Sequence, residues 1–141
     1  MPGIRSGKSP GPVDFTLALR VYWEDTDAAG IVFYANYLKF FERARTEWLR
    51  SKGFEQERLR SSLGIAFVVT DTSVRYRAPA RLDDVLDVSV SVDHCGQASL
   101  TLAQDARCAG GLVAEGTIRI GCVELGTFRP CRIPNDILQA I

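Results

Sequence analysis

The carboxylate of Asp27 is the side chain in this sequence best placed for chemistry. It lies in the polar stretch EDTDAAG (residues 24–30), which closes in a glycine and so predicts a turn. A predicted helix opens within the next seven residues, around residues 34–36. The first N–H groups of a helix carry about half a positive charge, which suits a developing oxyanion, and a nearby carboxylate can attack an acyl carbon or deprotonate a water that does. The same residue types also form ordinary turns, so the pattern alone leaves both interpretations open.

The residues that other classes of enzyme require are missing from this sequence or poorly placed in it. The only histidine, His94, lies on the apolar side of a predicted strand beside a turn, where a packing role is favoured. A hydratase or dehydratase would need a histidine paired with an acid, and His94 lies far along the chain from the acidic turn. The sequence contains no GxSxG motif and no glycine-rich phosphate loop. Glu24 and Asp25 are expected to be structural, because acidic residues commonly serve turns and caps.

The four cysteines indicate no metal or redox chemistry. Cys95, Cys108, Cys122 and Cys131 are 13, 14 and 9 positions apart and form no CxxC pair. We expect them to be small buried or half-buried residues. Neither a metal site nor a cofactor is predicted.

The elements that must position Asp27 are a strand before it and a long helix after it. Residues 14–24 alternate apolar and polar side chains, as a half-buried strand does, with Trp23 on the apolar side. Residues 35–53 place apolar side chains at helical spacing, and Gly53 is the predicted stop. A second, shorter helical stretch is predicted over residues 55–63.

Period-two patterns continue from Gly64 almost to the end of the chain. They predict four further strands that follow one another as a meander, with hairpin turns at residues 96–97 and 109–111. The stretch FRPCRIP then leads into a tail predicted to form one helical turn. The four strands are expected near residues 66–77, 86–93, 100–108 and 112–120.

Each predicted strand has one apolar face, and the long helix has a wide one. The simplest packing wraps an antiparallel sheet of about five strands around the helix, an α+β arrangement of the hotdog type. Such a sheet has free edges, which proteins pair or cover, so a dimer or a higher oligomer is expected.

The length and the net charge of the chain limit the class of protein further. The 141 residues suffice for one core, and we expect a tail without structure over residues 1–13 and a single domain over residues 14–141. The 17 basic and 17 acidic residues give zero net charge, which argues against a nucleic-acid partner.

No apolar run approaches the roughly 20 residues of a membrane span, and the N-terminal residues lack the apolar middle of a signal peptide. A cytoplasmic protein is therefore expected.

Residues 20–37, RVYWEDTDAAGIVFYANY, resemble the signature of the 4-hydroxybenzoyl-CoA thioesterase family of hotdog proteins. The similarity is greatest to the YbgC-like branch, the Tol-Pal-associated acyl-CoA thioesterases. It extends from about Phe15 to Ile137 and includes FFERARTEWLR at residues 40–50, YRAPARLDD at residues 76–84 and RPCRIP at residues 129–134.

The resemblance implies an acyl-CoA thioesterase that needs no cofactor. It assigns Asp27 to the catalytic carboxylate, as nucleophile or general base, and Tyr34 to the position whose backbone N–H binds the thioester oxygen. Many YbgC-like sequences carry histidine where this one has Tyr34; a main-chain donor would tolerate that change, whereas a role for the histidine side chain would weaken catalysis here. Some hotdog thioesterases place the acid on the helix, but Glu42 is expected to pair with Arg43 and Arg45.

Family architecture also implies active sites at a dimer interface, with pantetheine running beside Val68, Val69 and Thr70. A plain core strand explains these three residues equally well. The phosphates of CoA need cationic partners. Candidates are Arg75, Arg77, Arg81, Arg129 and Arg132.

The main alternative function is a non-catalytic module of an envelope-associated complex that binds an acyl thioester or acyl-carrier protein. Intact Asp27 and Gly30 favour the enzyme. Both CoA and acyl-carrier protein stay open as carriers, and both a dimer and a homotetramer as assemblies.

Overall fold

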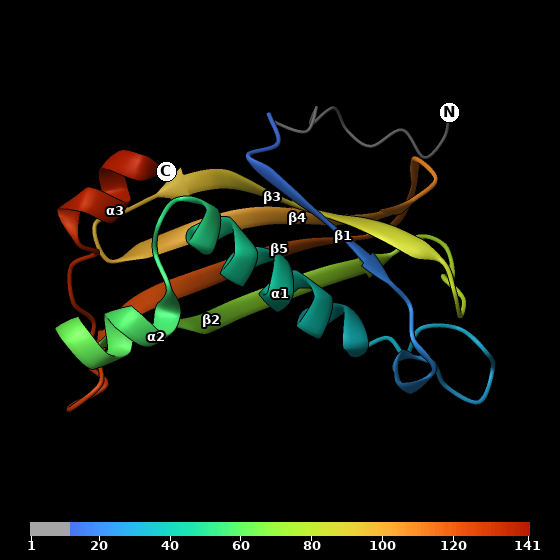
Figure 1. Ribbon diagram of the computed structural model, residues 1–141, viewed down its shortest axis with the longest axis horizontal. Helices are drawn as coiled ribbons and strands as arrows, with labels where there is room; N and C mark the ends of the chain where they lie inside the picture. The colour runs from blue at the N-terminus through green and yellow to red at the C-terminus, as the bar shows by residue number, and fades with distance from the viewer. Residues whose placement is uncertain (1–11) are drawn as a thin grey trace.

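The structure, a computed structural model, describes residues 12–141, which form a five-stranded antiparallel sheet with a long helix across one face (Figure 1). This confirms the predicted α+β arrangement, while residues 1–11 of the predicted tail lie outside the described residues. The strands are β1 (Phe15–Arg20), β2 (Ile65–Tyr76), β3 (Val85–Cys95), β4 (Ser99–Cys108) and β5 (Gly111–Glu124). The helical elements are η1 (Trp23–Asp25), α1 (Asn36–Ser51), α2 (Gln56–Arg58), η2 (Leu59–Leu63) and α3 (Asn135–Ala140).

The strand order β1-β3-β4-β5-β2 corrects one expectation. Strands β3, β4 and β5 form a meander through short turns, but β2 pairs with β5 instead of β3 and lies at an edge of the sheet. The connection after β2 pairs with the loop before α1 instead: the Val32 N–H donates to the Ala80 carbonyl at 2.8 Å, and Ile31 forms a bridge with Arg81. A period-two pattern predicts which face a side chain takes but not which strand lies alongside.

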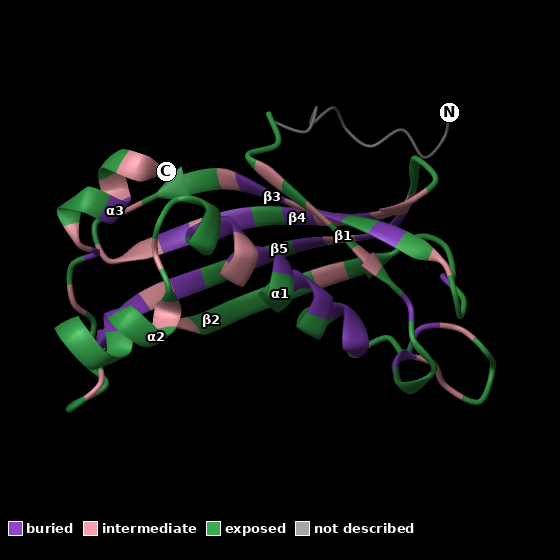
Figure 2. Cartoon of the chain, in the orientation of Figure 1, coloured by how far each residue is buried: buried purple, intermediate pink, exposed green. Residues whose placement is uncertain are grey.

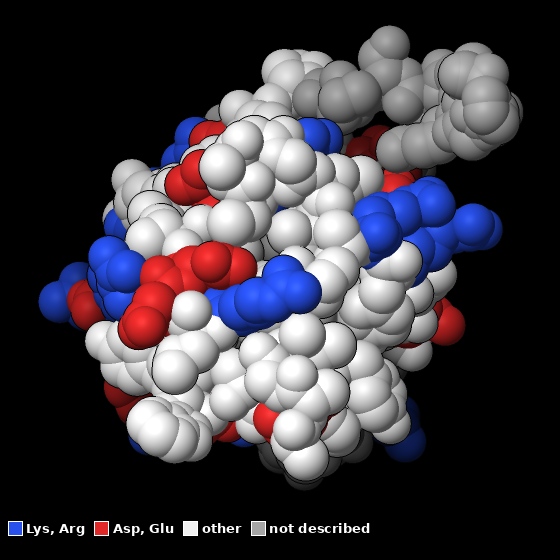
Figure 3. Space-filling view, turned by 90° about the vertical axis from the view of Figure 1, so that its right-hand side faces the viewer, with Lys and Arg blue, Asp and Glu red and all other residues white. Residues whose placement is uncertain are grey.

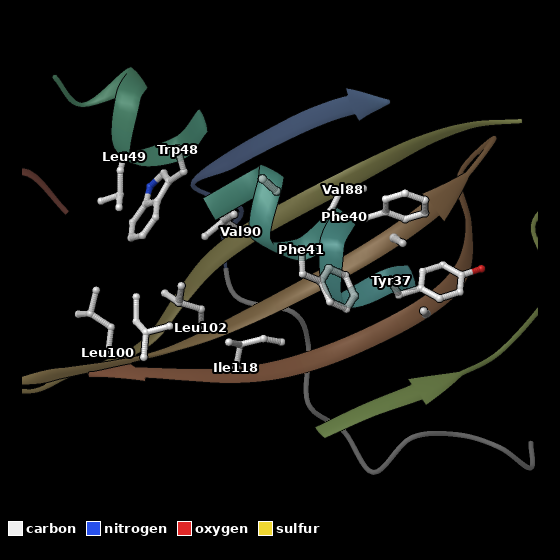
Figure 4. Close-up of a cluster of buried hydrophobic side chains, with 14 of the residues drawn as sticks. Tyr37, Phe40, Phe41, Trp48, Leu49, Val88, Val90, Leu100, Leu102 and Ile118 are labelled. Atoms are coloured by element: carbon white, nitrogen blue, oxygen red, sulfur yellow. The ribbon is translucent and has the colours of Figure 1, made fainter. Parts of the chain in front are cut away.

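Helix α1 forms because its apolar residues recur every three or four positions and so share the face that meets the sheet. Phe41 and Trp48 are completely buried. Figure 4 shows α1 side chains lying against the inner face of the sheet, and Figure 2 shows buried residues gathered in α1 and the central strands. The sheet contributes Val88, Val90, Leu100, Leu102 and Ile118 to this core.

The predicted stop at Gly53 is confirmed by the hydrogen bonds that end α1. The Gly53 N–H donates to the Arg50 carbonyl and the Phe54 N–H to the Leu49 carbonyl, both at 2.9 Å. This is the Schellman arrangement, in which the residue after the cap takes a left-handed conformation. Gly53 does so with a φ of 92°.

Two residues predicted on apolar strand faces are exposed. Strand β1 ends at Arg20, and Trp23 lies in η1 with 81% of its surface exposed, because the chain turns where the Asp25 carboxylate accepts the Tyr22 N–H. His94 is exposed because a register shift between Val92 and His94 breaks the alternation of β3.

Candidate active site

The loop between η1 and α1 holds Asp27 at one end of the molecule (Figure 1). Its two arms pair through a bridge between Thr26 and Val32. The Asp27 N–H donates to the Ile31 carbonyl, and the Gly30 N–H donates to the Asp27 carbonyl, both at 2.9 Å. Gly30 has a φ of 79°, a conformation that favours glycine, so the predicted turn is present.

The Asp27 carboxylate is half-buried and held from one side. Its Oδ1 accepts the Ala29 N–H at 2.9 Å. Within residues 12–141, Oδ2 accepts no hydrogen bond. The turn thus orients the carboxylate and leaves one oxygen for a proton or an acyl carbon.

Asp25 has a different environment from Asp27, although only Thr26 separates them. It is 4% exposed, and both of its carboxylate oxygens are occupied. Oδ2 accepts the Tyr22 N–H and Oδ1 accepts the Asn36 Nδ2–H, each at 2.7 Å. These contacts agree with the structural role that was expected for Asp25.

The backbone of Tyr34 presents a hydrogen-bond donor just before α1. Its N–H has no acceptor in the described part of the chain, and Ala35 caps the helix with no side-chain hydrogen bond. Its carbonyl accepts the Tyr76 hydroxyl at 2.8 Å. The Tyr34 side chain is 63% exposed, whereas its backbone carbonyl is held by the Tyr76 hydroxyl.

One backbone hydrogen bond ties the segment that carries the Asp27 carboxylate to the segment that carries this donor. The Phe33 N–H donates to the Asp25 carbonyl at 2.9 Å. Asp27 follows Asp25 by two residues, and Tyr34 follows Phe33 directly. Residues seven positions apart in the sequence are thus held close to a single contact.

Tyrosines surround this end of the molecule. Tyr76 lies 6.3 Å from Tyr34 and 5.7 Å from Tyr37, measured between ring centroids. Burial raises the pKa of Tyr37 to about 12, and burial, with a smaller contribution from Tyr34, raises the pKa of Tyr76, so both phenols are neutral donors at pH 7. Figure 3 views this end and shows a broad uncharged surface beside a band of basic and acidic side chains. The exposed aromatic residues here are Tyr22, Trp23, Phe33, Tyr34 and Tyr76.

Val68, Val69 and Thr70 lie in the middle of β2, away from the loop. Val68 is half-buried, Val69 is 50% exposed and Thr70 is exposed at a register shift, so they do not form a core strand. Thr70 is six positions from Tyr76, about 20 Å of extended chain.

The candidate arginines fall into two groups. Arg75, Arg77 and Arg81 lie in or after the end of β2 that reaches the loop, and Arg77 forms an ion pair of 2.7 Å with Glu115. The remaining two, Arg129 and Arg132, follow β5 at the opposite end of β2.

Glu42 does not form the surface pairs that were expected. It accepts a hydrogen bond from the Thr46 hydroxyl, while Arg45 turns inward and donates to the Gln104 side chain at 3.0 Å. Arg45 is 9% exposed because it lies on the face of α1 that meets the sheet, and burial lowers its pKa.

Two residues of the site were not found from the sequence, Asn36 and Tyr76. Asn36 lies four residues before Phe40 and so shares its buried face. A polar side chain at such a position needs a buried partner, and this was the available signal. Tyr76 carries no local signal, because its contact with Tyr34 spans 42 positions.

The cysteines differ partly from expectation. Cys122 is buried and Cys108 and Cys131 are half-buried, but Cys95 is exposed near the end of β3. The Cys122 and Cys131 sulfurs are 3.5 Å apart, and burial raises the pKa of Cys122 to about 12. Among residues 12–141 there is no group of His, Cys, Asp and Glu that could hold a metal, and no helix long and apolar enough to cross a membrane.

Comparisons with known proteins place this fold and loop in one family. The thioesterase-like superfamily matches residues 21–141. The acyl-CoA thioesterase YbgC of Haemophilus influenzae is 39% identical over 126 residues, which cover 89% of this chain and 93% of that protein. A probable thioesterase from Bartonella henselae is 30% identical with a TM-score of 0.81, over 84% of this chain and 98% of the other. A 1,4-dihydroxy-2-naphthoyl-CoA thioesterase from Synechocystis is 25% identical with a TM-score of 0.84, over 90% of this chain and 94% of the other.

The chain therefore belongs to the thioesterase-like superfamily. The predictions of a YbgC-like relationship, a hotdog fold and a thioester hydrolase are confirmed.

Proposed function

We propose that this protein hydrolyses acyl-CoA thioesters to a free acid and CoA, with Asp27 as the reacting carboxylate and the Tyr34 backbone N–H as oxyanion donor. The observation that carries the proposal is the hydrogen bond between Phe33 and Asp25, which holds a half-free carboxylate and an unpaired N–H at one end of the sheet. The relatives named for acyl-CoA thioester hydrolysis support the substrate class.

Two routes use the same groups. In the nucleophilic route the Asp27 carboxylate attacks the thioester carbonyl, the CoA thiolate leaves, and water opens the resulting mixed anhydride. In the general-base route Asp27 takes a proton from the water that attacks the carbonyl, and the C–S bond then breaks to release the CoA thiolate. In both routes the carbonyl oxygen gains negative charge, and the Tyr34 N–H donates to it.

We assign the pantetheine arm of the substrate to the exposed face of β2. Val68, Val69 and Thr70 offer a partly apolar strip about 20 Å from the loop end of β2. Arg75 and Arg81 are the candidates for the CoA phosphates near the loop, since Arg77 is already paired with Glu115. An acyl-carrier protein could present the same pantetheine arm.

We also propose that the protein works as a homo-oligomer in the cytoplasm. Strand β2 is an edge of the sheet in the single chain, and open edges are generally paired or covered. Two copies paired along β2 would enclose the strip formed by Val68, Val69 and Thr70 between them, in a dimer or in half of a homotetramer.

Thiol release from short, long and aromatic acyl-CoAs tests the reaction and the residue together. We expect release by the wild type and a loss of at least about 100-fold in Asp27→Asn, the usual scale for losing a general base. Asp14→Asn is the matched control, because the Asp14 carboxylate also accepts one backbone N–H, from Val92 at 2.8 Å. Asp14 lies just before the first residue of β1, at the end of that strand away from the loop. This variant should keep wild-type activity.

The possible results separate the parts of the proposal. Thiol release that is indifferent to Asp27→Asn would exclude the assigned carboxylate while leaving the substrate class intact. No release from any acyl-CoA, with tight binding of an acyl-carrier protein, would instead favour the non-catalytic binding module. Oxygen-18 from water appearing in the Asp27 carboxylate during one turnover would select the nucleophilic route over the general-base route.

A further inference from the structure

The buried carboxylate of Asp25 lacks the cation that such groups usually require. It is 4% exposed, and within residues 12–141 no lysine or arginine forms an ion pair with it. Its two partners are the backbone N–H of Tyr22 and the side-chain amide of Asn36, which is itself 7% exposed. Burying a charge on neutral donors is costly. A less costly residue would suffice if the contact only filled space.

The contacts of Asp25 join three segments of chain. Its carboxylate binds Tyr22, at the start of η1, and Asn36, the first residue of α1. Its carbonyl accepts the Phe33 N–H, in the arm of the loop that leads into the helix. One residue therefore sets the distance between the segment that carries Asp27 and the start of α1.

The anchoring of the helix start through the Asn36 side chain leaves the Tyr34 N–H without a side-chain cap. A serine, threonine or aspartate cap would accept a hydrogen bond from one of the first N–H groups of the helix. Here Ala35 provides no such cap, and the helix is anchored through the Asn36 side chain instead. The Tyr34 N–H stays without an acceptor in the described chain. The Asp25 charge also lies at the positive end of α1, which stabilises both.

We infer that Asp25 and Asn36 are positioning residues for thioester hydrolysis, whose buried carboxylate–amide hydrogen bond sets the Asp27 carboxylate against the Tyr34 N–H. This inference rests on the proposed function. Neither residue touches the reacting atoms. Their effect on rate comes through the geometry of the loop, where displacements near 1 Å cost about 100-fold in rate.

Steady-state kinetics of Asp25→Asn and Asn36→Ala test the inference. Asp25→Asn keeps the shape but turns one acceptor into a donor, and Asn36→Ala removes the amide alone. We expect kcat to fall between about 10-fold and 100-fold in each folded variant, with KM changed less than about threefold. If Asp25→Asn does not fold, Asn36→Ala tests the same bond with the Tyr22 contact preserved.

The matched control is Gln104→Met. Gln104 is completely buried and bonds Arg45 and the Phe41 carbonyl beneath the middle of α1, away from the loop. We expect this variant to lower Tm at least as much as Asn36→Ala while kcat stays within about twofold of the wild type, since lost stability alone does not alter kcat. A kcat that followed Tm in all the variants would overturn the inference.

The exchanged pair Asp25→Asn/Asn36→Asp provides a rescue. The new amide at position 25 can accept the Tyr22 N–H and donate to the new carboxylate at position 36, so both contacts are rebuilt. We expect kcat to recover at least about fivefold over Asp25→Asn, because coupled partners deviate from additivity. No recovery, or wild-type kcat in Asp25→Asn, would overturn the inference. Asp27→Asn measured alongside separates the two levels: if it is fully active, the proposed function fails and not only this inference.

Discussion

At the scale of single residues, environment separates two aspartates of the same motif. Asp25 is buried with both oxygens engaged, whereas Asp27 is half-buried with one oxygen open. A carboxylate with occupied oxygens holds structure, and one with a free oxygen can exchange protons or form a bond. The two aspartates of EDTD are only two positions apart, and the contacts of each agree with the separate roles expected for them.

The oxyanion role proposed for the Tyr34 N–H predicts a difference between two substitutions. Tyr34→Ala removes the exposed side chain but keeps the N–H, so thiol release should stay within about threefold of the wild type. Tyr34→Pro removes the N–H, and its ring suits the start of a helix, so kcat should fall about 100-fold to 1000-fold, as for other lost oxyanion donors. Circular dichroism would show that both variants are folded. Equal losses in the two variants would assign the role to the phenol ring.

At the scale of elements, the position of α1 depends on close packing against a glycine in β5. A Cβ added at Gly116 would lie 3.0 Å from Phe41 Cε2 and 3.0 Å from Ile118 Cδ1. Both neighbours are buried and cannot move aside freely. The helix thus approaches the sheet where β5 has no side chain, opposite Gln104 of β4.

Gly116→Ala is accordingly expected to destabilise the protein by about 1–3 kcal/mol, the range for overpacking a core. Urea unfolding followed by tryptophan fluorescence measures the change. Gly111→Ala is the control, because its added Cβ would meet only the Cys108 carbonyl at 3.5 Å, an ordinary contact. A loss at Gly111 equal to that at Gly116 would mean that chain flexibility, and not the contact with α1, explains the effect.

At the scale of the whole molecule, the two edges of the sheet are not equivalent. Strand β2 is 12 residues long and exposes Val69 and Tyr76, whereas β1 has six residues. A long edge with exposed apolar side chains favours association with another strand. Association of two identical edges has twofold symmetry, the commonest arrangement of oligomers.

The proposed pairing of β2 edges predicts the result of placing a charge there. Val69→Lys should convert the oligomer to a single chain, because lysine on an edge strand opposes pairing. Light scattering after size-exclusion chromatography gives the mass of each variant. Thr16→Lys places the same charge on the exposed face of β1 and should leave the oligomer intact. A wild-type protein with the mass of one chain would contradict the proposal, as would dissociation by Thr16→Lys but not by Val69→Lys.

What the sequence determined by itself was local in origin. The 3.6-residue and two-residue periods predicted α1 and its stop at Gly53, the five strands and the hairpin turns, because backbone propensity and amphipathic pattern act over a few residues. The motif around Asp27 and Tyr34 indicated the family for the same reason: its residues are contiguous.

The tertiary structure alone decided what depends on distant pairing. It placed β2 at an edge beside β5, exposed Trp23, and joined Asp25 to Asn36 and Tyr76 to Tyr34. These features depend on contacts between segments that are far apart in the sequence. The free energy of such a contact depends on which residues the fold brings together, and a local pattern does not contain that information. The residues proposed for the chemistry therefore lie in one contiguous motif, while their geometry depends on contacts with the rest of the fold.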